Sequence, residues 1–428
     1  MLDPARGSLG APQDKLHGLS SLEDRSRRLR LQWMLGVVLF VVAVGYLVNA
    51  WLGREIDFVV YRAGGAAVLA GRSLYGQQFN GMGLPFTYPP VTAICFTVLS
   101  WLSIRLAQEA WTLASLFALW AYVRLVVGFG RATLPAFTAP VVLGITVLMA
   151  VSDPGGKTLS FGQINLFLAL MVMADLAGAL PRVPRGVFIG LAAALKLTPL
   201  FLIPVLFATR RTRAGINAAA TFVAVSLLAA LLDPSQSTLY WLHGDFAHAR
   251  RVGNVAYLSN QSLYGFIGRV WGTSGAAQWT WLILAGTVGI GIMMLCRRLE
   301  LTRPGLANGV ALMGMLFVSP VSWVHHWVFA LPFVYEMWRL ALEKAISPGA
   351  RRVLLVLVGS LTLVLLSGAI WIAPHGSTAN YRVNVPMILL GNSQILLALI
   401  AVCAVAGAMI HLPEVRVDST GARTTPIR

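Results

Sequence analysis

The sequence predicts an all-α integral membrane protein with about 12 transmembrane helices, and three observations lead to this prediction. Hydrophobic residues make up 57% of the 428 positions and charged residues only 11%, whereas an ordinary soluble domain carries roughly 25% charged residues. The mean hydropathy is +0.73. Apolar runs of about 18 or more residues recur along the chain, and a helix of that length crosses a hydrocarbon core of about 30 Å.

The first predicted helix, at 33–52, follows a polar N-terminal segment that ends in an arginine cluster at 25–30. The apolar run is long and lacks a small-residue cleavage site, so it does not resemble a secretory signal peptide. We therefore expect an uncleaved first helix with its N-terminus in the cytoplasm.

Polar breaks separate the remaining apolar runs, and an even number of crossings leaves both termini in the cytoplasm. The basic clusters around 210–213, 297–303 and 339–352 then fall on the cytoplasmic side, as the positive-inside rule requires. The predicted helices are 33–52, 88–104, 108–127, 135–152, 164–180, 186–207, 215–232, 277–296, 305–320, 327–342, 353–372 and 386–410.

The region 105–185 fits this threading poorly, because several of its arginines fall outside and the polar segment 153–163 falls inside. A broken or re-entrant element in this region would satisfy its backbone within the protein. Such an element would also change which face of the membrane the segment SFGQIN (160–165) meets.

The threading divides the chain into a cytoplasmic N-terminal segment (1–32), a polytopic membrane domain (33–410) and a cytoplasmic tail (411–428). Short inner loops and long outer ones suggest that the protein acts at the outer face. The long outer segments are 53–87, 233–276 and 373–385.

The formal charge of +17 sits mostly in short clusters between apolar runs. That pattern orients helices and contacts anionic membrane lipid, so we expect no nucleic-acid partner. The three cysteines, Cys95, Cys296 and Cys403, all fall inside apolar runs. They predict neither a disulfide framework nor a metal site.

Few carboxylates are available at the outer face. A catalytic base at the outer face must be one of these few carboxylates, unless a histidine acts as the base. Asp233 precedes Pro234 at a helix end, where aspartate is common as a turn or cap residue. The outer carboxylates are Glu55, Asp57, Asp233 and Asp245.

Asp57 stands out because of its setting in the segment REIDFVVYR (54–62). It lies just beyond the first helix among apolar neighbours, where desolvation raises a carboxyl pKa and the nearby Arg54 and Arg62 lower it. Such opposed influences are typical of a tuned general base. The alternative is an amphipathic interfacial helix in which Asp57 only pairs with Arg54 or Tyr61.

Two further outer segments place polar groups beside aromatic rings. The stretch FTYPP (86–90) carries Tyr88, followed by prolines that begin the second helix in an ordinary way. The stretch SNQSLYG (259–265) offers amides and hydroxyls, which bind sugars together with aromatic faces. The alternative for this second stretch is a hydrogen-bonded helix cap.

The segment SPVSWVHHW (319–327) contains two adjacent histidines, His325 and His326. Adjacent side chains point in different directions from a helix, and no cysteine, histidine and aspartate set with ligand spacing accompanies them, so we expect no structural metal. Donation to a phosphate or a sugar hydroxyl is one interpretation. A packed interfacial histidine is the other.

Lys196 is the only basic residue that the threading leaves inside the membrane, in the predicted helix 186–207. An ionisable residue there is costly, so Lys196 is a candidate functional residue. The alternative is a structural ion pair inside the bundle with a partner such as Asp175.

These segments occur in an order that resembles glycosyltransferase family 87 across roughly 54–327. The members are polytopic GT-C enzymes that take a sugar from a polyprenyl-phosphate donor. The resemblance therefore implies a GT-C fold whose extracytoplasmic loops carry interfacial helices. The matching features are REIDFVVYR, Gly71, Tyr75, FTYPP, then KLTP, NQSL and SPVSWVHHW.

The resemblance implies an inverting mannosyltransferase at the outer face of the plasma membrane. Its donor is polyprenyl-phosphate-mannose, and its acceptor is the 2-hydroxyl of a phosphatidylinositol mannoside. The acidic residue of the first outer loop, which falls on Asp57, serves as the base that deprotonates the acceptor. Since Glu55 and Asp57 form less than a full Asp-x-Asp, no cofactor or obligatory metal is expected, although a divalent metal is not excluded.

The family also implies groups that bind the substrates. Fixed donors stabilise the charge that develops on the departing lipid phosphate. The expected phosphate-binding residues are His325, His326, Lys196, Arg250 and Arg251, and the expected sugar- and acceptor-binding residues are Glu55, Tyr61, Arg62, Tyr88, Asn260, Gln261 and Trp323.

Several alternatives share these features. A family relative that uses decaprenyl-phosphate-arabinose, or one that acts on lipomannan, would carry the same motifs. A transporter or flippase for a lipid-linked sugar would also have many crossings and an intramembrane lysine, although asymmetric outer loops and the lack of a visible repeat argue against it. A non-catalytic scaffold would tolerate the loss of Asp57.

Overall fold

The computed structural model describes residues 13–53, 55–79, 83–130, 138–247, 252–344, 346–376 and 384–410. The fold of these residues is helical, and no strand occurs among them. Two isolated β-bridges join Gln78 to Pro85 and Asn260 to Trp323. The all-α prediction is therefore confirmed.

The elements follow one another along the chain as α-helices interrupted by short 3-10 or π turns, labelled η. They are α1 (Gln13–Trp51), α2 (Ile56–Leu69), α3 (Pro90–Cys95), η1 (Phe96–Trp101), α4 (Ile104–Gly128), α5 (Thr138–Val151), α6 (Asp153–Ser160), α7 (Asn165–Ala177), α8 (Val187–Leu195), η2 (Thr198–Phe201), α9 (Leu202–Ala208), α10 (Thr212–Leu232), α11 (Pro234–Ser237), η3 (Thr238–Leu242), η4 (Asp245–Ala247), α12 (Leu263–Trp271), α13 (Gly275–Leu299), α14 (Pro304–Val318), η6 (Val324–Ala330), α15 (Leu331–Ala341), α16 (Pro348–Ser367), η7 (Ala369–Ile372), α17 (Val385–Gly391) and α18 (Ser393–Ile410).

The described chain is a multi-pass membrane protein. Five helices are long and apolar enough to cross a membrane: Arg25–Trp51 of α1, then α4, α10, α13 and α16. The pairs α5–α6 and α17–α18 bend by 71° and 72° at short breaks, and counting each pair as one span raises the number to seven. Shorter apolar helices, including α7 and α14, complete the bundle.

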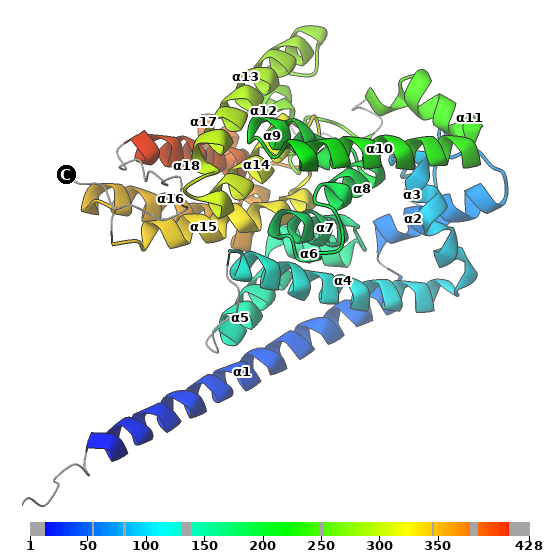
Figure 1. Ribbon diagram of the computed structural model, residues 1–428. Coiled ribbons are helices and arrows are strands. Elements are labelled where there is room, and N and C mark those ends of the chain that lie inside the picture. The colour runs from blue at the N-terminus through cyan, green and yellow to red at the C-terminus, as the bar shows by residue number, and fades with distance from the viewer. Residues whose placement is uncertain are drawn as a thin grey trace, which may run out of the picture.

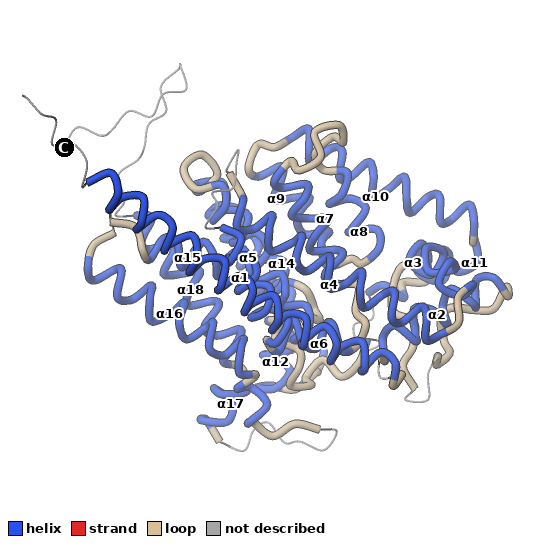
Figure 2. Tube along the Cα trace, turned by 90° about the horizontal axis from the view of Figure 1, so that it is seen from below, coloured by secondary structure: helices blue, strands red, loops and turns tan. Residues whose placement is uncertain are grey.

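The long helix α1 runs beside α4 and α5, and its N-terminal part extends away from the bundle (Figure 1). It begins at Gln13, well before the predicted start at residue 33. The added residues are mostly polar but include several leucines and arginines, which favour helix. The short elements α2, α3 and α11 gather at one end of the molecule in both ribbon and tube views (Figure 2).

The break between α5 and α6 lies in the region where the sequence fits a simple threading poorly. Ser152 caps α6 by accepting a hydrogen bond from the backbone N–H of Gly155 at 3.1 Å. The following Asp153 and Pro154 begin a new helix, since proline suits a first turn. The region 105–185 therefore contains a bent pair of helices, the kind of element that its poor fit to the threading had raised as a possibility.

The prediction of one continuous helix over 186–207 is wrong. The helix α8 ends at Leu195, and Lys196 is extended with φ −152° and ψ 127°. Pro199 causes the break, because its ring clashes with the carbonyl four residues earlier, that of Leu195. Thr92 satisfies this freed carbonyl with a hydroxyl hydrogen bond of 2.6 Å.

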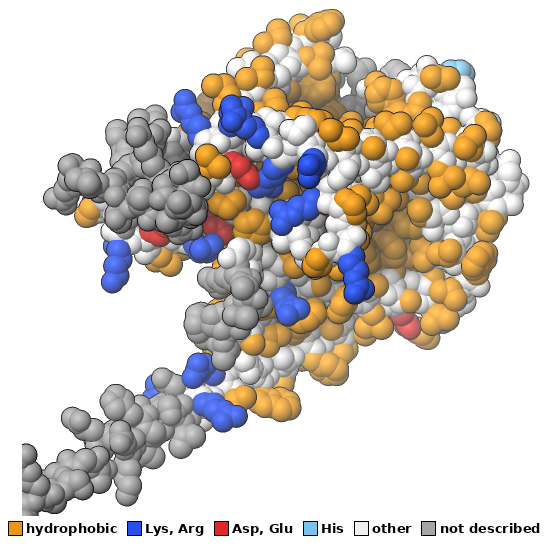
Figure 3. Space-filling model, in the orientation of Figure 1, with side chains coloured by type: hydrophobic (Ala, Val, Ile, Leu, Met, Phe, Trp, Pro, Cys, Tyr) orange, Lys and Arg blue, Asp and Glu red, His pale blue; other side chains and the backbone are white. Residues whose placement is uncertain are grey.

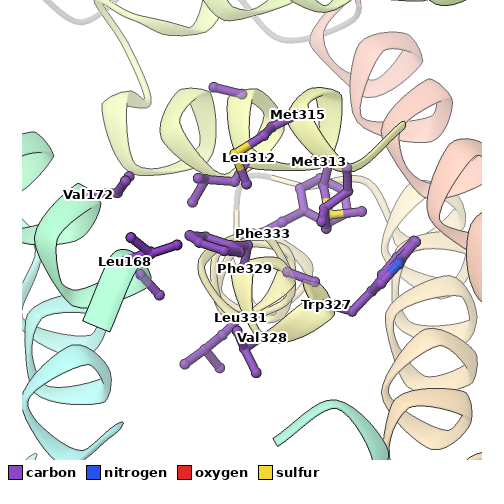
Figure 4. Packing of buried hydrophobic residues seen from close by; sticks show 14 of the residues in the cluster. Leu168, Val172, Leu312, Met313, Met315, Trp327, Val328, Phe329, Leu331 and Phe333 are labelled. Atoms are coloured by element: carbon purple, nitrogen blue, oxygen red, sulfur yellow. The ribbon is translucent and has the colours of Figure 1, made fainter. Parts of the chain in front are cut away.

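The core of the bundle forms around η6 and α15, which pack between α7 and α14 (Figure 4). Leu168 and Val172 approach from α7, and Leu312 and Met313 from α14. All of these side chains are buried. This packing fixes the start of η6, which carries both histidines.

The contact between α14 and α15 depends on Gly309. A Cβ atom at this position would lie 2.6 Å from Cα of Phe333, a backbone atom that cannot move aside. We expect Gly309→Ala to lower the free energy of unfolding by about 1 to 3 kcal/mol through overpacking. Thermal unfolding in detergent measures this change.

Gly291→Ala on the exposed face of α13 is the matched control, because nothing lies within 4 Å of its added methyl group. This variant should be neutral or more stable, since alanine favours helix over glycine. Equal stability of the two variants would contradict the close approach of α14 and α15.

Candidate active site

A cavity of about 570 Å³ lies between α2, the turn after α6, the break after α8 and the start of η6. Its volume is in the range of small-molecule sites. One part of the wall is polar and consists of Asp57, Gln163, Lys196, His325 and His326. Much of the remaining wall is apolar and includes Leu84, Leu197, Leu200, Phe201, Pro204, Phe246, Met315 and Val318.

Asp57 lies in the first turn of α2, where backbone N–H groups have no partner within the helix. The carbonyl of Phe161 accepts hydrogen bonds from the N–H groups of Asp57 at 3.0 Å and Phe58 at 3.2 Å. This contact ties the start of α2 to the end of α6. It brings Gln163 beside Asp57, and the two side chains hydrogen-bond.

Burial raises the pKa of Asp57 to about 6, while the hydrogen bond from Gln163 and the positive charge of Lys196 hold it down. The pKa of Asp57 is therefore subject to opposed influences, as expected from the sequence, but the groups that lower it are Gln163 and Lys196. Arg62 donates instead to the carbonyls of Leu99 at 3.2 Å and Leu102 at 3.0 Å. Arg54 lies outside the described residues.

Tyr61 and Tyr88 hold the other end of Gln163. Their hydroxyl groups lie 2.7 Å apart, and both reach Oε1 of Gln163, at 2.7 and 3.3 Å. The alternative in which Tyr61 serves as the partner of Asp57 is therefore wrong, because the hydroxyl of Tyr61 donates to Gln163. Tyr88 also lines the cavity.

Lys196 donates to Oδ1 of Asn165 at 2.8 Å, and Nδ2 of the same amide donates to the carbonyl of His325 at 3.0 Å. The ammonium group also lies 5.3 Å from the ring centre of Tyr88. Asp175 is not its partner, because both carboxylate oxygens accept backbone N–H groups at the start of α8. The alternative in which Lys196 forms a structural ion pair with Asp175 is therefore wrong.

His325 and His326 are buried at the start of η6, with 7% and 5% of their surface exposed. Their rings are 4.8 Å apart and inclined by 77°, yet both line the cavity. Nε2 of His325 and Nδ1 of His326 have no hydrogen-bond partner among the residues that the structure describes. Buried nitrogen atoms without partners are available to a ligand.

Several predicted binding residues have structural roles instead. Asn260 bonds to the carbonyls of Val255 and Pro320 and to the N–H of Ser322. Gln261 donates to two carbonyls, including that of Gly391 at 2.8 Å. These amides satisfy backbone groups that would otherwise be buried without partners.

Glu55 and Arg62 do not line the cavity either. Glu55 is fully buried and accepts a hydrogen bond from Thr112 on α4. Arg250 and Arg251 lie outside the described residues. Trp323, in contrast, lines the cavity.

Gln163 and Asn165 were missed as site residues by reasoning from the sequence. The segment SFGQIN (160–165) that contains them was noticed only for its uncertain side of the membrane. A signal was present, because two amides stand at the start of the apolar run of α7. Within the described residues, no group of three histidine, cysteine or acidic side chains could hold a metal ion.

The helical bundle and this mixed polar and apolar cavity define a multi-pass membrane enzyme. The sequence profile of glycosyltransferase family 87 matches residues 86–322. The chain belongs to this family. The match includes Gln163 and Lys196, whereas Asp57 and both histidines lie beyond its ends.

Curated relatives extend the similarity. A protein from Mycobacterium tuberculosis named "polyprenol-phosphate-mannose-dependent alpha-(1-2)-phosphatidylinositol mannoside mannosyltransferase" is 35% identical over 71% of this chain and 76% of its own length. A protein from Mycolicibacterium smegmatis named for a phosphatidylinositol pentamannoside is 30% identical over 83% of this chain and 87% of its own length.

Among solved structures, ArnT from Cupriavidus metallidurans bound to undecaprenyl phosphate has a TM-score of 0.37 and 15% identity, covering 87% of this chain and 77% of its own. The family predicted from the sequence is confirmed by the profile and the curated relatives. A glycosyltransferase forms a bond, so the flippase and scaffold alternatives are set aside.

Proposed function

We propose that the protein transfers mannose from polyprenyl-phosphate-mannose to the 2-hydroxyl of a phosphatidylinositol mannoside, forming an alpha-1,2 linkage. The names of the curated relatives support this donor and acceptor. One observation carries the proposal. A buried carboxylate, Asp57, shares one cavity with the Lys196 ammonium and two histidines that have unpartnered nitrogens.

Asp57 is proposed as the general base. It removes the proton from the acceptor hydroxyl as that oxygen attacks the anomeric carbon of mannose. A beta-linked donor then gives an alpha-linked product in one displacement, so no enzyme nucleophile is needed. The hydrogen bond from Gln163 keeps Asp57 in its charged form, which is the form that accepts a proton.

Lys196, His325 and His326 are proposed to bind the donor phosphate. The bond between the anomeric carbon and the phosphate oxygen breaks, and negative charge grows on the lipid phosphate. A fixed ammonium and fixed imidazole N–H groups in a partly dry cavity stabilise this charge. The unpartnered nitrogens of both histidines suit this role.

The apolar part of the cavity is proposed to take the first units of the polyprenyl chain. Leu200 and Pro204 line this part and are also exposed on the outside of the bundle. The lipid can therefore extend sideways into the membrane while its phosphate meets Lys196. The donor never has to leave the bilayer.

The active site is proposed to face the extracytoplasmic side. On the face shown in Figure 3, lysine and arginine side chains gather toward the end where α1 begins, away from α2 and α11. The positive-inside rule puts that basic end in the cytoplasm. We also propose that segments 1–32 and 411–428 lie in the cytoplasm and that 33–410 forms the membrane domain.

The acidic side of the pH profile should report on Asp57. Since the base acts in its charged form and its pKa is raised by burial to about 6, kcat/KM should rise about tenfold per pH unit below that value. The other titratable groups that line this cavity are Tyr88, Lys196, Tyr240, His325 and His326.

Initial rates with labelled donor across about pH 4.5 to 8 measure this profile. Unfolding followed over the same range serves as the control for acid instability. A rate that does not change between about pH 5 and 7 would remove Asp57 from the role of a titrating base.

The function itself is tested with purified protein reconstituted in lipid vesicles. Radiolabelled polyprenyl-phosphate-mannose and a phosphatidylinositol mannoside are supplied, and the glycolipid product is separated and its linkage determined. Parallel reactions contain decaprenyl-phosphate-arabinose as donor or lipomannan as acceptor. Transfer of mannose to the small glycolipid supports the proposal, and preference for either parallel reaction would correct the donor or the acceptor.

A further inference from the structure

We infer that the segment SFGQIN (160–165) is the positioning element of the reaction, with Gln163 orienting the carboxylate of Asp57 and Asn165 orienting the ammonium of Lys196. The inference rests on the proposed function, since it assigns these two groups to base and phosphate binder. It concerns two residues that are not themselves proposed to react. In each amide, the oxygen accepts hydrogen bonds from donor groups and the NH₂ group donates to an acceptor group.

The amide of Gln163 has one orientation that satisfies all its neighbours. A charged carboxylate can only accept hydrogen bonds, so Asp57 requires the NH₂ end of the amide. Hydroxyl groups can donate, and those of Tyr61 and Tyr88 meet Oε1 at 2.7 and 3.3 Å. A flipped amide would place its oxygen against the carboxylate, and the like charges would repel.

The same reasoning applies to Asn165, with the ends reversed. The carbonyl of His325 can only accept, and it takes the NH₂ group of Asn165 at 3.0 Å. An ammonium group can only donate, and Lys196 meets Oδ1 at 2.8 Å. Thr158 also donates to the carbonyl of His325 at 2.9 Å, which fixes the histidine backbone to α6.

The turn that carries both amides is held tightly. Gly162 has φ +67°, and a Cβ atom there would lie 2.6 Å from Cβ of Phe58. Its carbonyl accepts a hydrogen bond of 2.8 Å from the indole of Trp111. The N–H of Gln163 donates to the carbonyl of Thr158 at 2.9 Å. A rigid turn therefore sets the separation between the base and the phosphate-binding cation.

The two amides should affect different kinetic constants. Gln163→Met keeps the length of the side chain but leaves Asp57 free to rotate, so kcat should fall on the order of 100-fold. The acidic limb of the pH profile should move to higher pH, because the lost hydrogen bond favoured the charged carboxylate. Asn165→Leu should instead raise KM for the donor by about tenfold, since Lys196 loses its acceptor.

Replacing Tyr61 and Tyr88 tests the orientation of the Gln163 amide without changing the glutamine side chain itself. Tyr61→Phe or Tyr88→Phe alone leaves one hydroxyl on the amide oxygen, so each should lower kcat by less than about tenfold. The double variant frees that oxygen and should lower kcat by more than the product of the two single effects. Tyr122→Phe is the matched control, because its buried hydroxyl donates to Val328 away from the cavity.

The deciding experiment combines kinetics with infrared titration of the Asp57 carboxyl group in the full-length protein. The carboxylic acid band that is lost in Asp57→Asn identifies the group, and its titration midpoint is then measured in wild type and Gln163→Met. A midpoint that moves to higher pH, with normal thermal unfolding, supports the inference. Gln278→Met on exposed α13 should leave both the midpoint and kcat unchanged.

The outcomes separate the inference from the proposed function. An unchanged midpoint in a folded Gln163→Met protein would overturn the positioning role, whatever the wild-type protein transfers. Additive effects of the two tyrosine replacements would also overturn it. A wild-type protein that transfers no sugar would contradict the proposed function, while the infrared midpoint would still decide whether Gln163 controls Asp57.

Discussion

Asp57→Asn is expected to lower the rate of sugar transfer by at least about 100-fold, as removal of a general base does. Asparagine has nearly the same shape as aspartate but cannot take the proton of the acceptor hydroxyl. The variant should fold normally, because its buried side chain no longer carries a charge. KM for the donor should change less than kcat, since Lys196 and the histidines are the proposed phosphate contacts.

Glu55→Gln is the matched control for this prediction. Glu55 lies two residues away in the same segment, but it is fully buried against Thr112 on α4 and does not line the cavity. Its replacement should keep transfer within about tenfold of wild type, since the worth of one hydrogen bond is limited. A large loss of transfer in Glu55→Gln, together with an active Asp57→Asn, would indicate that Glu55 rather than Asp57 is the general base.

Lys196→Met is expected to lower kcat/KM for the donor by about 100- to 1,000-fold, which is typical for the loss of a group that stabilises developing charge. Methionine keeps the length and apolar stem of the side chain while removing the cation. The effect should be larger than that of either single histidine replacement, because an ammonium group neutralises phosphate charge, whereas a neutral imidazole only donates a hydrogen bond. Initial rates at varied donor concentration measure this loss.

Lys157→Met on α6 provides the comparison. Lys157 pairs with Asp153 in the same helix and lies 4.2 Å from the ring centre of Trp371, outside the cavity wall. Its replacement should change kcat/KM by no more than about fivefold, because a partly exposed ion pair is worth about 1 kcal/mol or less. Similar losses for both lysines would point to a general effect of charge rather than to a phosphate contact.

Charged site residues could be found from the sequence because charge is rare in this chain. Asp57 was selected by elimination among a few outer carboxylates, and Lys196 by its cost inside an apolar run. Both side chains do line the cavity. The same logic failed for Arg62, since nothing in the sequence shows that the carbonyls of Leu99 and Leu102 lie within its reach.

Neutral amides gave no such signal. Asn260 and Gln261 were expected to bind sugar but instead satisfy buried carbonyl groups from distant segments, including that of Gly391. Gln163 and Asn165 were not selected, although they contact Asp57 and Lys196 directly. An amide is equally suitable for both tasks, and only the three-dimensional packing distinguishes them.

The membrane class, the helical fold, the family resemblance and the candidate charged groups all follow from the amino-acid sequence, because hydropathy and the cost of burying a charge are properties of each residue wherever it lies. Three features are visible only in the folded protein: the helix break at Lys196 before Pro199, the bend after α5 that brings Gln163 to Asp57, and the single cavity that both histidines line. These features depend on hydrogen-bond partners far apart in the chain. Such partners are chosen by long-range packing, which local periodicity does not encode.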